Sequence, residues 1–455
     1  MRSRDIQFEF VISDPVSNPK PGKSLQIRSR CMQGKNKREG SRRTQRENRK
    51  VAKETTKCAT RDKTTEASAD PSPIPLINYF VPIRFAGRGI DAEAKELLFK
   101  SFAYNIADQK KTPLDRCVDL ECLESSSFEW LFTDTAFLHS VLCASYAIND
   151  FMSPQWNGNP GRKTVFHLRE TLSLLRARMQ DEHVYQDEAV LRIIMNLTLL
   201  AAVFGDWVAA SAHFEGLHRV VHLRGNTAFL KARPTLHFKL DRIDLAWSLS
   251  SGQRPYFIQP IISWDCRVRD PYTPLPSDLY QPSPDWDFRL ANVFKDFQNI
   301  TLKINRNKLK FVIYNPAIFQ DDLASLQSRL MSLAEFVTTP IEQLVRLTML
   351  AMLTTTFRIP GRKVPYTWVV EQLRKNYIAA GNEIRRDKSL LLWVLVTVLI
   401  TVAGPNETWI QNAWTNTDTT LTWADVKADL LRVMWIEIVH DKPGEVVYQQ
   451  LQIAM

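Results

Sequence analysis

The longest apolar stretch of the chain is Leu390-Leu-Leu-Trp-Val-Leu-Val-Thr-Val-Leu-Ile-Thr-Val-Ala403, interrupted only by Thr397 and Thr401. A helix that crosses a hydrocarbon layer of about 30 Å needs about 20 such residues. These fourteen residues are too few to span a membrane. The stretch therefore predicts a helix buried in the core of a folded body.

The sequence around this stretch also favours helices. Leu98, Phe102 and Ile106 fall four residues apart, and similar stripes recur along the chain. Glycine makes up 15 of 455 residues, about half the usual fraction of ~7%, which argues against folds rich in tight turns. The predicted helices cover residues 92–106, 128–151, 165–179, 190–204, 207–224, 326–337, 341–357, 368–384, 390–403 and 424–436.

The remaining segments carry weaker signals. Turn residues dominate 253–290, which predicts an irregular connection. Residues 301–315 are ambiguous between helix and strand, and the end of the chain after 436 is expected to be a short tail. The sequence thus predicts an all-α body over residues 76–455.

Two local features of this body can be predicted in detail. Asp206 is expected to cap the start of the 207–224 helix, and Gly225 to end it. Trp247 shares a helical face with Ile243 and Ser250. We therefore expect Trp247 to anchor a core rather than to contact a ligand.

The first 70 residues hold nearly all the net charge of the chain. They contain 18 Lys and Arg against 9 Asp and Glu, a net charge of +9 out of +10, and the remaining 385 residues carry +1. Residues 20–63 have no aromatic residue and too little apolar surface to fold alone. We expect residues 1–75 to form a disordered basic arm that ends in a proline-rich linker.

A basic arm on a neutral body is typical of proteins that bind polyanions, with nucleic acid first and an acidic membrane surface second. Such an arm can also serve only as a nuclear-import signal or be a solvated tail. The densest part of the arm, residues 35–50, has no aromatic side chain, so it could hold phosphates but could not stack on bases. The candidate phosphate contacts are Lys35, Lys37, Arg38, Arg42, Arg43, Arg46, Arg49 and Lys50.

The sequence indicates an intracellular protein. Its first residues offer no apolar stretch long enough for a secretory signal. The six cysteines are few for the length and have no spacing typical of a disulfide framework. A reducing compartment fits this usage best.

The best candidate for a metal site lies on the 207–224 helix. His218 and His222 have the spacing of zinc ligands on one helical face, and His213 precedes them. The zinc-protease pattern needs a glutamate directly after its first histidine, and Arg219 stands there instead. An arginine at this place would repel a dication, so we expect no metal.

Other motifs are equally incomplete. Asp321-Asp322 lacks the third acid of a metal-diphosphate motif and is expected to cap a helix. Cys117 and Cys122 have no second cysteine pair, and the sequence contains neither a Gly-x-Ser-x-Gly elbow nor a glycine-rich phosphate loop. We therefore predict no catalytic residue, cofactor or metal, and no enzyme.

Several segments resemble, in their order, the fungal-specific regulatory domain that accompanies binuclear zinc-cluster transcription factors. Two of them are Gly205-Asp-Trp207 with His213-Phe-Glu-Gly-Leu-His-Arg-Val-Val-His-Leu-Arg-Gly225, and Asp244-Leu-Ala-Trp-Ser-Leu-Ser-Ser-Gly-Gln-Arg-Pro-Tyr-Phe257. Leu390–Trp393 and Trp423–Trp435 are similar to the last helices of that domain. The resemblance implies an all-helical regulatory body.

The opening of the chain also resembles a subset of these proteins, which begin with a basic segment rather than a zinc cluster. The segments concerned are Phe8-Glu-Phe10 and Ile27-Arg-Ser-Arg-Cys-Met32, followed by the basic run. The family reads DNA with a six-cysteine cluster that opens with Cys-x2-Cys-x6-Cys. The arm has only Cys31 and Cys58, so this module cannot be built here.

Two functions follow as hypotheses. The first is a nuclear transcription regulator whose helical body mediates regulation through an effector or a partner, with any DNA contact made non-specifically by the arm. The second is an interaction or scaffold protein that keeps the regulatory fold without binding DNA. The expected partners are DNA, proteins of the transcription machinery and a second copy of the chain, and no membrane.

Overall fold

The structure of the chain is a computed structural model. It describes residues 85–86, 90–106, 114, 117–118, 129–257, 262–268, 276–310, 314–356, 364, 366–404, 406–417 and 420–453. In this part, sixteen α-helices and four short 3-10 helices form, and the one β-type pairing is an isolated bridge between Val118 and Tyr314. The predicted all-α class is therefore confirmed for the body. The arm, residues 1–75, lies outside the described residues.

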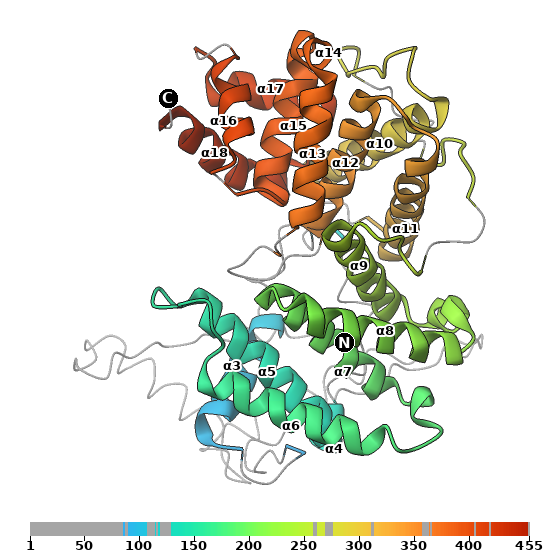
Figure 1. The fold of residues 1–455 in the computed structure, drawn as a ribbon, viewed down its shortest axis with the longest axis vertical. Coiled ribbons are helices and arrows are strands. Elements are labelled where there is room, and N and C mark those ends of the chain that lie inside the picture. Colours follow the sequence, from blue (N-terminus) through green and yellow to red (C-terminus); the bar gives the residue numbers. More distant parts are fainter. Residues whose placement is uncertain are drawn as a thin grey trace, which may run out of the picture. The chain divides into compact units, whose positions relative to one another are not determined.

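The helices before residue 225 build one hydrophobic core. They are α3 (Ala92–Ile106), α4 (Trp130–Thr133), α5 (Thr135–Met152), α6 (Arg162–Arg178), α7 (Glu188–Phe204) and α8 (Trp207–Leu223). α5 packs against α6 and α7, and α7 packs against α8 (Figure 1). Leu98, Leu138, Val190 and Leu217 lie in this core, fully shielded from solvent. We call it the first core.

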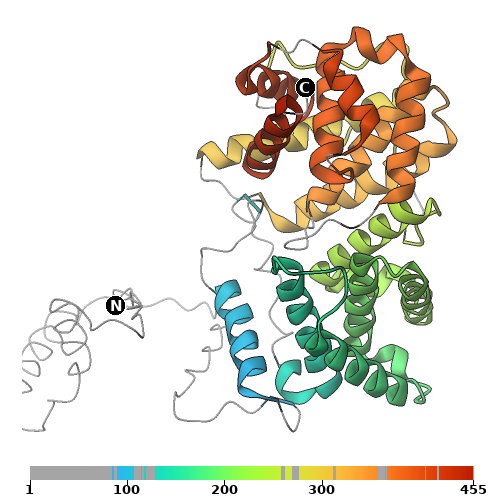
Figure 2. The same ribbon diagram turned by 60° about the vertical axis from the view of Figure 1, so that its left-hand side comes forward.

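The helices after residue 287 build a second core. They are α10 (Phe288–Lys310), α11 (Pro316–Ser332), α12 (Pro340–Leu353), α13 (Thr367–Ala380), α14 (Asn382–Arg386), α15 (Lys388–Thr401), α16 (Thr408–Thr415), α17 (Trp423–Val433) and α18 (Glu437–Ile453). Figures 1 and 2 show them as one yellow-to-red group. α15 contains the opening stretch, is buried from Leu390 to Thr401 and contacts α12, α17 and α18. The predicted core helix is confirmed.

One helix contributes to both cores. α9 (Pro234–Ser251) contacts α7 on one side and α11 and α13 on another. Its Leu245 and Leu249 belong to the second core, whereas Ile243 and Trp247 belong to the first. Trp247 is 8% exposed and stacks on Phe214, with ring centroids 5.0 Å apart. The prediction that Trp247 anchors a core is confirmed.

The helix α8 begins and ends at the residues that the sequence indicates. The Asp206 carboxylate accepts a hydrogen bond from the N–H of Ala209 at 3.0 Å and caps α8. Gly225 follows α8 with a φ of 85°, in the left-handed region that glycine tolerates best. Both predictions for this helix are confirmed.

Three predicted boundaries are wrong. Asp321 and Asp322 do not cap a helix, because α11 already begins at Pro316 and its cap is Asn315, which accepts from the N–H groups of Ala317 and Ile318. The predicted helix over 128–151 is two helices, because the Asp134 carboxylate caps a new start at residue 135. The predicted helix over 368–384 is also two, with Gly381 between α13 and α14.

Three helices lie where the sequence analysis predicts none or leaves the structure open. The described part of the ambiguous segment 301–315 is mostly the second half of α10, which starts inside the predicted connection. α16 was not predicted, and the expected short tail contains the 17-residue α18. Pro443 and Gly444 lie inside α18, although this pair of residue types is typical of the end of a helix. Among the described residues, no helix combines the length and the apolar character needed to cross a membrane.

Candidate functional site

The eight arm residues predicted to contact nucleic acid lie outside the described residues. They are Lys35, Lys37, Arg38, Arg42, Arg43, Arg46, Arg49 and Lys50. The described residues therefore show candidate sites of the body only.

The two segments 205–225 and 244–257, which carry the family resemblance, pack against each other. The Asp244 carboxylate accepts hydrogen bonds from the N–H groups of Tyr256 and Phe257, both at 2.9 Å, and so folds the chain back after α9. The Tyr256 ring then lies 4.3 Å from the ring of His218 on α8. Burial raises the pKa of Asp244 to about 7, against the two backbone hydrogen bonds that lower it.

Of the three histidines of α8, His218 and His222 stack with ring centroids 6.3 Å apart. His218 rests on Tyr256, and the Nδ1 atom of His222 is 3.1 Å from the Oδ1 atom of Asn226. Burial lowers the pKa of His213 and of His218. The described residues contain no group of three or more side chains arranged to hold a metal ion, here or elsewhere.

Buried charges on α9 link it to α11. Arg242 donates from Nη2 to the Oε1 atom of Gln327 at 2.6 Å, and Gln327 donates back to the backbone oxygen of Asp241 at 2.8 Å. Burial raises the pKa of Asp241 to about 7 and lowers that of Arg242 to about 10. These groups are shielded from solvent and bonded to the protein, which fits a role in holding α9 in place.

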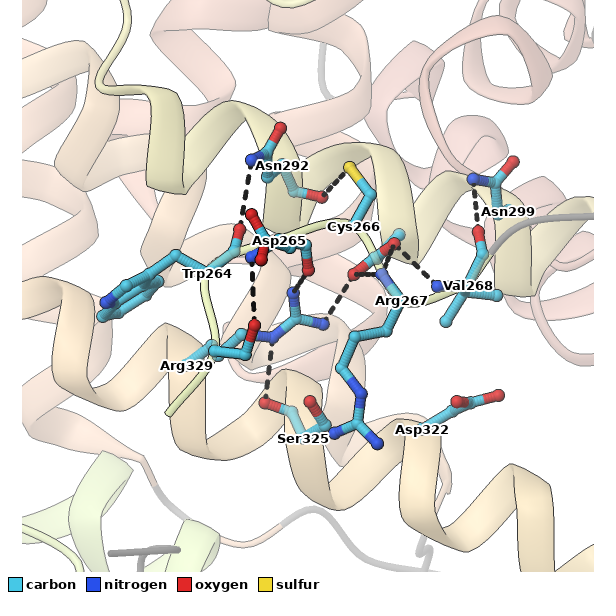
Figure 3. Close-up of polar contacts among 12 residues, drawn as sticks. Trp264, Asp265, Cys266, Arg267, Val268, Asn292, Asn299, Asp322, Ser325 and Arg329 are labelled. Carbon is cyan, nitrogen blue, oxygen red and sulfur yellow. Dashed lines mark hydrogen bonds and ion pairs between the residues drawn. The ribbon is translucent and has the colours of Figure 1, made fainter. Parts of the chain in front are cut away.

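A second polar network holds residues 264–268, which we call the strap, along one face of α10 (Figure 3). Asn292 donates to the first carbonyl of the strap at 3.1 Å, and Asn299 donates to the last at 2.7 Å. Asp296 accepts from the last two N–H groups of the strap, each at 3.0 Å. The three α10 side chains are spaced four and three residues apart, so they share one helical face.

Arg329 of α11 neutralises this network. Its Nη2 atom lies 2.7 Å from Oδ2 of Asp296, and the two side chains are 2% and 0% exposed. Arg329 also donates from Nη1 to the carbonyl of Asp265 and from Nε to that of Ser325, both at 3.4 Å (Figure 3). Because the charges are paired and bonded to backbone, the network is a clamp that joins the strap, α10 and α11.

A pocket of about 300 Å³ opens beside the end of α8. Its residues come from the 3-10 helix η4 (Val184–Gln186), from the end of α8, from the 3-10 helix η5 (Asn226–Ala232) and from the residue after it. We call it the Arg224 pocket. It is lined by Tyr185, Gln186, Leu223, Arg224, Phe229 and Arg233.

One carboxylate near this pocket is already neutralised. Glu188 accepts from Nε of Arg233 at 2.5 Å and from Nη2 of Arg192 at 3.0 Å. Burial alone would raise the pKa of Glu188, but the hydrogen bonds from the two arginines outweigh it and lower the pKa. Glu188 is therefore held as an anion by two cations.

Arg224 interacts with the charges of Glu188 and Asp187 at longer range. Its Nη2 donates to the carbonyl of Gln186, and its guanidinium lies 4.8 Å from the centre of the Phe229 ring. Its Nη1 atom is shielded from solvent and makes no hydrogen bond, and Arg224 forms no ion pair within the part of the chain described. Burial lowers the pKa of Arg224, and the nearby charges of Glu188 and Asp187 oppose this change.

The sequence analysis did not single out this pocket. Arg224 and Arg233 stand before a glycine and a proline, where a surface arginine is ordinary. Only the fold brings Tyr185 next to Phe229, which lies 44 residues later in the chain. Comparison with known proteins adds no guide, since no protein-family model, curated protein or solved structure matches the chain.

Proposed function

We propose that the protein is a nuclear, transcription-regulator-like protein whose helical body is a regulatory domain and whose basic arm makes any contact with DNA. The observation that carries this proposal is the distribution of charge. Residues 1–70 hold a net +9 of the chain's +10, and they precede a body that is nearly neutral. Such an asymmetry suits a polyanionic partner for the arm and other partners for the body.

The packing of the resembling segments supports the second half of the proposal. Residues 205–225 and 244–257 meet through Phe214, whose ring is 5.0 Å from that of Trp247 and 6.2 Å from that of Phe257. The segments are thus parts of one folded unit, as the resemblance to a regulatory domain requires.

The proposed DNA contact is electrostatic. The arm lacks the cysteines of a zinc cluster, and residues 20–63 have no aromatic side chain. Its sequence therefore contains no recognisable element that reads bases. Each phosphate that a Lys or Arg neutralises releases counterions, so log K falls with log salt at a slope of about −0.9 per contact. With about 6–8 contacts, binding should be weak, measurable near 50 mM salt and largely lost near 200 mM.

The test is a titration of the full chain against two unrelated duplexes at several salt concentrations, followed by fluorescence anisotropy. Replacing Arg42, Arg43, Arg46 and Arg49 with Ala should flatten the salt slope by about four units. A matched control removes four exposed arginines of the body and should leave the slope unchanged. The control residues are Arg169, Arg176, Arg219 and Arg385.

A second candidate function is an interaction or scaffold protein that does not bind DNA. The absence of the six-cysteine cluster favours it, since only Cys31 and Cys58 occur in the arm. The same titration separates the two. No binding at 50 mM salt supports the scaffold, whereas tight, sequence-selective binding that survives 200 mM salt contradicts the electrostatic arm. Proteins of the transcription machinery and a second copy of the chain are the proposed partners of the body in either case.

A further inference from the structure

The helix α6 leaves part of its apolar stripe open to solvent. Five apolar residues along α6 and its C-terminal cap recur at steps of three and four, which is the spacing of a helix–helix contact. They are Val165, Leu168, Leu172, Leu175 and Met179. Of these, only Leu175 is buried, whereas Leu172 is 38% exposed and Met179 is 44% exposed.

The face that α6 buries is instead largely polar. α6 packs mainly on α5 (Figure 1). Thr164 donates to the Asp150 carboxylate of α5 at 2.6 Å, and the Nδ1 atoms of His167 and His139 are 2.8 Å apart. Thr171 is also fully buried. A surface helix normally turns its apolar stripe to the core, so the outer edge of this stripe is available to a partner.

A column of arginines runs beside the open edge of the stripe. Three arginines each come three residues before an apolar residue of the stripe, and the pairs repeat every seven residues. The pairs are Arg162 with Val165, Arg169 with Leu172, and Arg176 with Met179. Successive arginines therefore lie about 10.5 Å apart along one side of the helix. All three are exposed, and none forms an ion pair with a described residue.

The other cations of α6 are already paired. Lys163 bonds to the Asp91 carboxylate, and Arg178 donates to both carboxylate oxygens of Asp134 at 2.6 Å. Glu170 is the only acid in the sequence of α6. It directly follows an arginine of the column, which places it about 100° further around the helix. The arginine column is therefore a positive edge beside an apolar one.

We propose that this face of α6 binds an acidic amphipathic helix of a partner protein. We call it the α6 face; it consists of Arg162, Val165, Arg169, Leu172, Arg176 and Met179. In paired helices, apolar residues at heptad spacing interlock, and charged residues beside them form ion pairs across the contact. The inference goes beyond the proposed function, because it concerns the body and holds whether or not the arm binds DNA.

The α6 face favours this partner over two others. A second copy docked about a two-fold axis would bring the arginines of one α6 close to those of the other, where they repel. A nucleic-acid backbone would meet the arginines but offers little apolar surface to Leu172 and Met179. An acidic amphipathic helix complements both edges of the face.

The probe is a fluorescein-labelled peptide of three heptads, each Leu-Ala-Ala-Leu-Glu-Ala-Glu. It is titrated with the full-length protein at low salt, where screening is weak, and followed by fluorescence anisotropy. We expect a dissociation constant on the order of 10 μM. A matched peptide carries Gln in place of each Glu. It should bind about tenfold more weakly, because one exposed ion pair changes affinity by up to about fivefold and several are lost together.

The triple variant Arg162→Gln, Arg169→Gln, Arg176→Gln should weaken binding of the Glu peptide about tenfold and leave that of the Gln peptide unchanged. The control variant changes three exposed arginines outside α6 to Gln and should alter neither. Its residues are Arg219, Arg385 and Arg386. Both variants keep the same arm and the same net charge, so the attraction of the arm for an acidic peptide cancels between them.

A second variant tests the apolar edge. Leu172→Gln with Met179→Gln keeps every arginine and should weaken binding of both peptides. Because both side chains are exposed, the change should leave the fold intact, and thermal unfolding of each variant checks this.

Three results would overturn the proposal. They are the absence of Glu-peptide binding at about 100 μM, ten times the expected dissociation constant; equal binding of the Glu and Gln peptides; and equal Glu-peptide binding by the triple variant and the control variant. None of these three bears on DNA binding by the arm, so the two proposals fail separately. Weaker binding of a DNA duplex by the triple variant than by the control, with peptide binding unchanged, would assign the α6 face to nucleic acid instead.

Discussion

Replacing Gly252 with Ala should lower the free energy of unfolding more than the same replacement at a glycine that also has a positive φ but has no atoms close to its would-be Cβ. Gly252 ends α9 with a φ of 75°, and its N–H bonds to the carbonyl of Ser248 at 2.9 Å. A Cβ atom at this position would lie 2.4 Å from Cε2 and Nε1 of the Trp368 ring on α13. The glycine therefore allows the end of α9 to touch α13.

The magnitude has two parts. An L side chain in the left-handed region costs about 1–2 kcal/mol. The overlap with Trp368 adds about 1–3 kcal/mol, the usual cost of overpacking. Gly225→Ala is the matched control, because Gly225 has a φ of 85° but no atom within 4 Å of its would-be Cβ. Any effect of alanine on the unfolded chain is common to both variants and cancels in their difference.

The assay is urea unfolding of the full-length protein and of both variants, followed by circular dichroism. Gly252→Ala should lower the free energy of unfolding by about 1–3 kcal/mol more than Gly225→Ala does. Adding Trp368→Ala to Gly252→Ala should remove that excess, after correction for the single Trp368→Ala change. Equal losses in the two glycine variants would refute the contact between the end of α9 and α13.

Further expectations concern buried side chains. Trp247→Ala should lower the free energy of unfolding by about 3–5 kcal/mol, as truncation of an aromatic core residue does, and a variant that melts like the wild type would contradict its burial. Arg329→Met should cost about 3–5 kcal/mol in urea unfolding because it leaves the Asp296 carboxylate buried and unpaired, and a loss below 1 kcal/mol would contradict the clamp. His167 should make stability fall as pH drops, because burial first, then the charges of His139 and of Lys163, lower its folded-state pKa to about 4 from an ordinary 6.5. Below pH 6.5 the unfolded chain therefore binds a proton that the folded chain does not, and between pH 7 and pH 5 the wild type should lose about 2 kcal/mol more than His167→Gln, whereas parallel curves would contradict the shift.

Much of the fold could be predicted because its helices carry clear apolar stripes and end signals. α15 is apolar all round and fully buried, and α8 has both Asp206 at its start and Gly225 at its end. Such local signals decide where a helix begins and ends before tertiary contacts are known.

The misses have physical reasons. α18 contains Pro443 and Gly444, which usually break a helix, but a Cβ on Gly444 would lie 2.8 Å from the Trp423 ring, so the glycine lets the two meet. α10 carries Leu290, Phe297 and Ile304 on its buried side at helical spacing, a signal that could have revealed it. The polar residues of α10 that bond to the strap, Asn292, Asp296 and Asn299, interrupt the apolar pattern of the helix.

The Arg224 pocket could not be predicted from the sequence, for a different reason. A pocket depends on which side chains the fold brings together, and the residues of the Arg224 pocket come from segments separated along the chain. The buried, unbonded Nη1 atom of Arg224 is visible only once the fold is known. Local sequence holds neither kind of information.

The most direct test of the proposed function is chromatin occupancy of the tagged full-length protein in cells. The wild type and the body control variant, which lacks Arg169, Arg176, Arg219 and Arg385, should both be recovered with chromatin. The arm variant, which lacks Arg42, Arg43, Arg46 and Arg49, should lose most of that signal while being expressed at the same level. Occupancy no higher than that of an untagged strain, or occupancy that the arm variant retains in full, would contradict a regulator that contacts DNA through its basic arm.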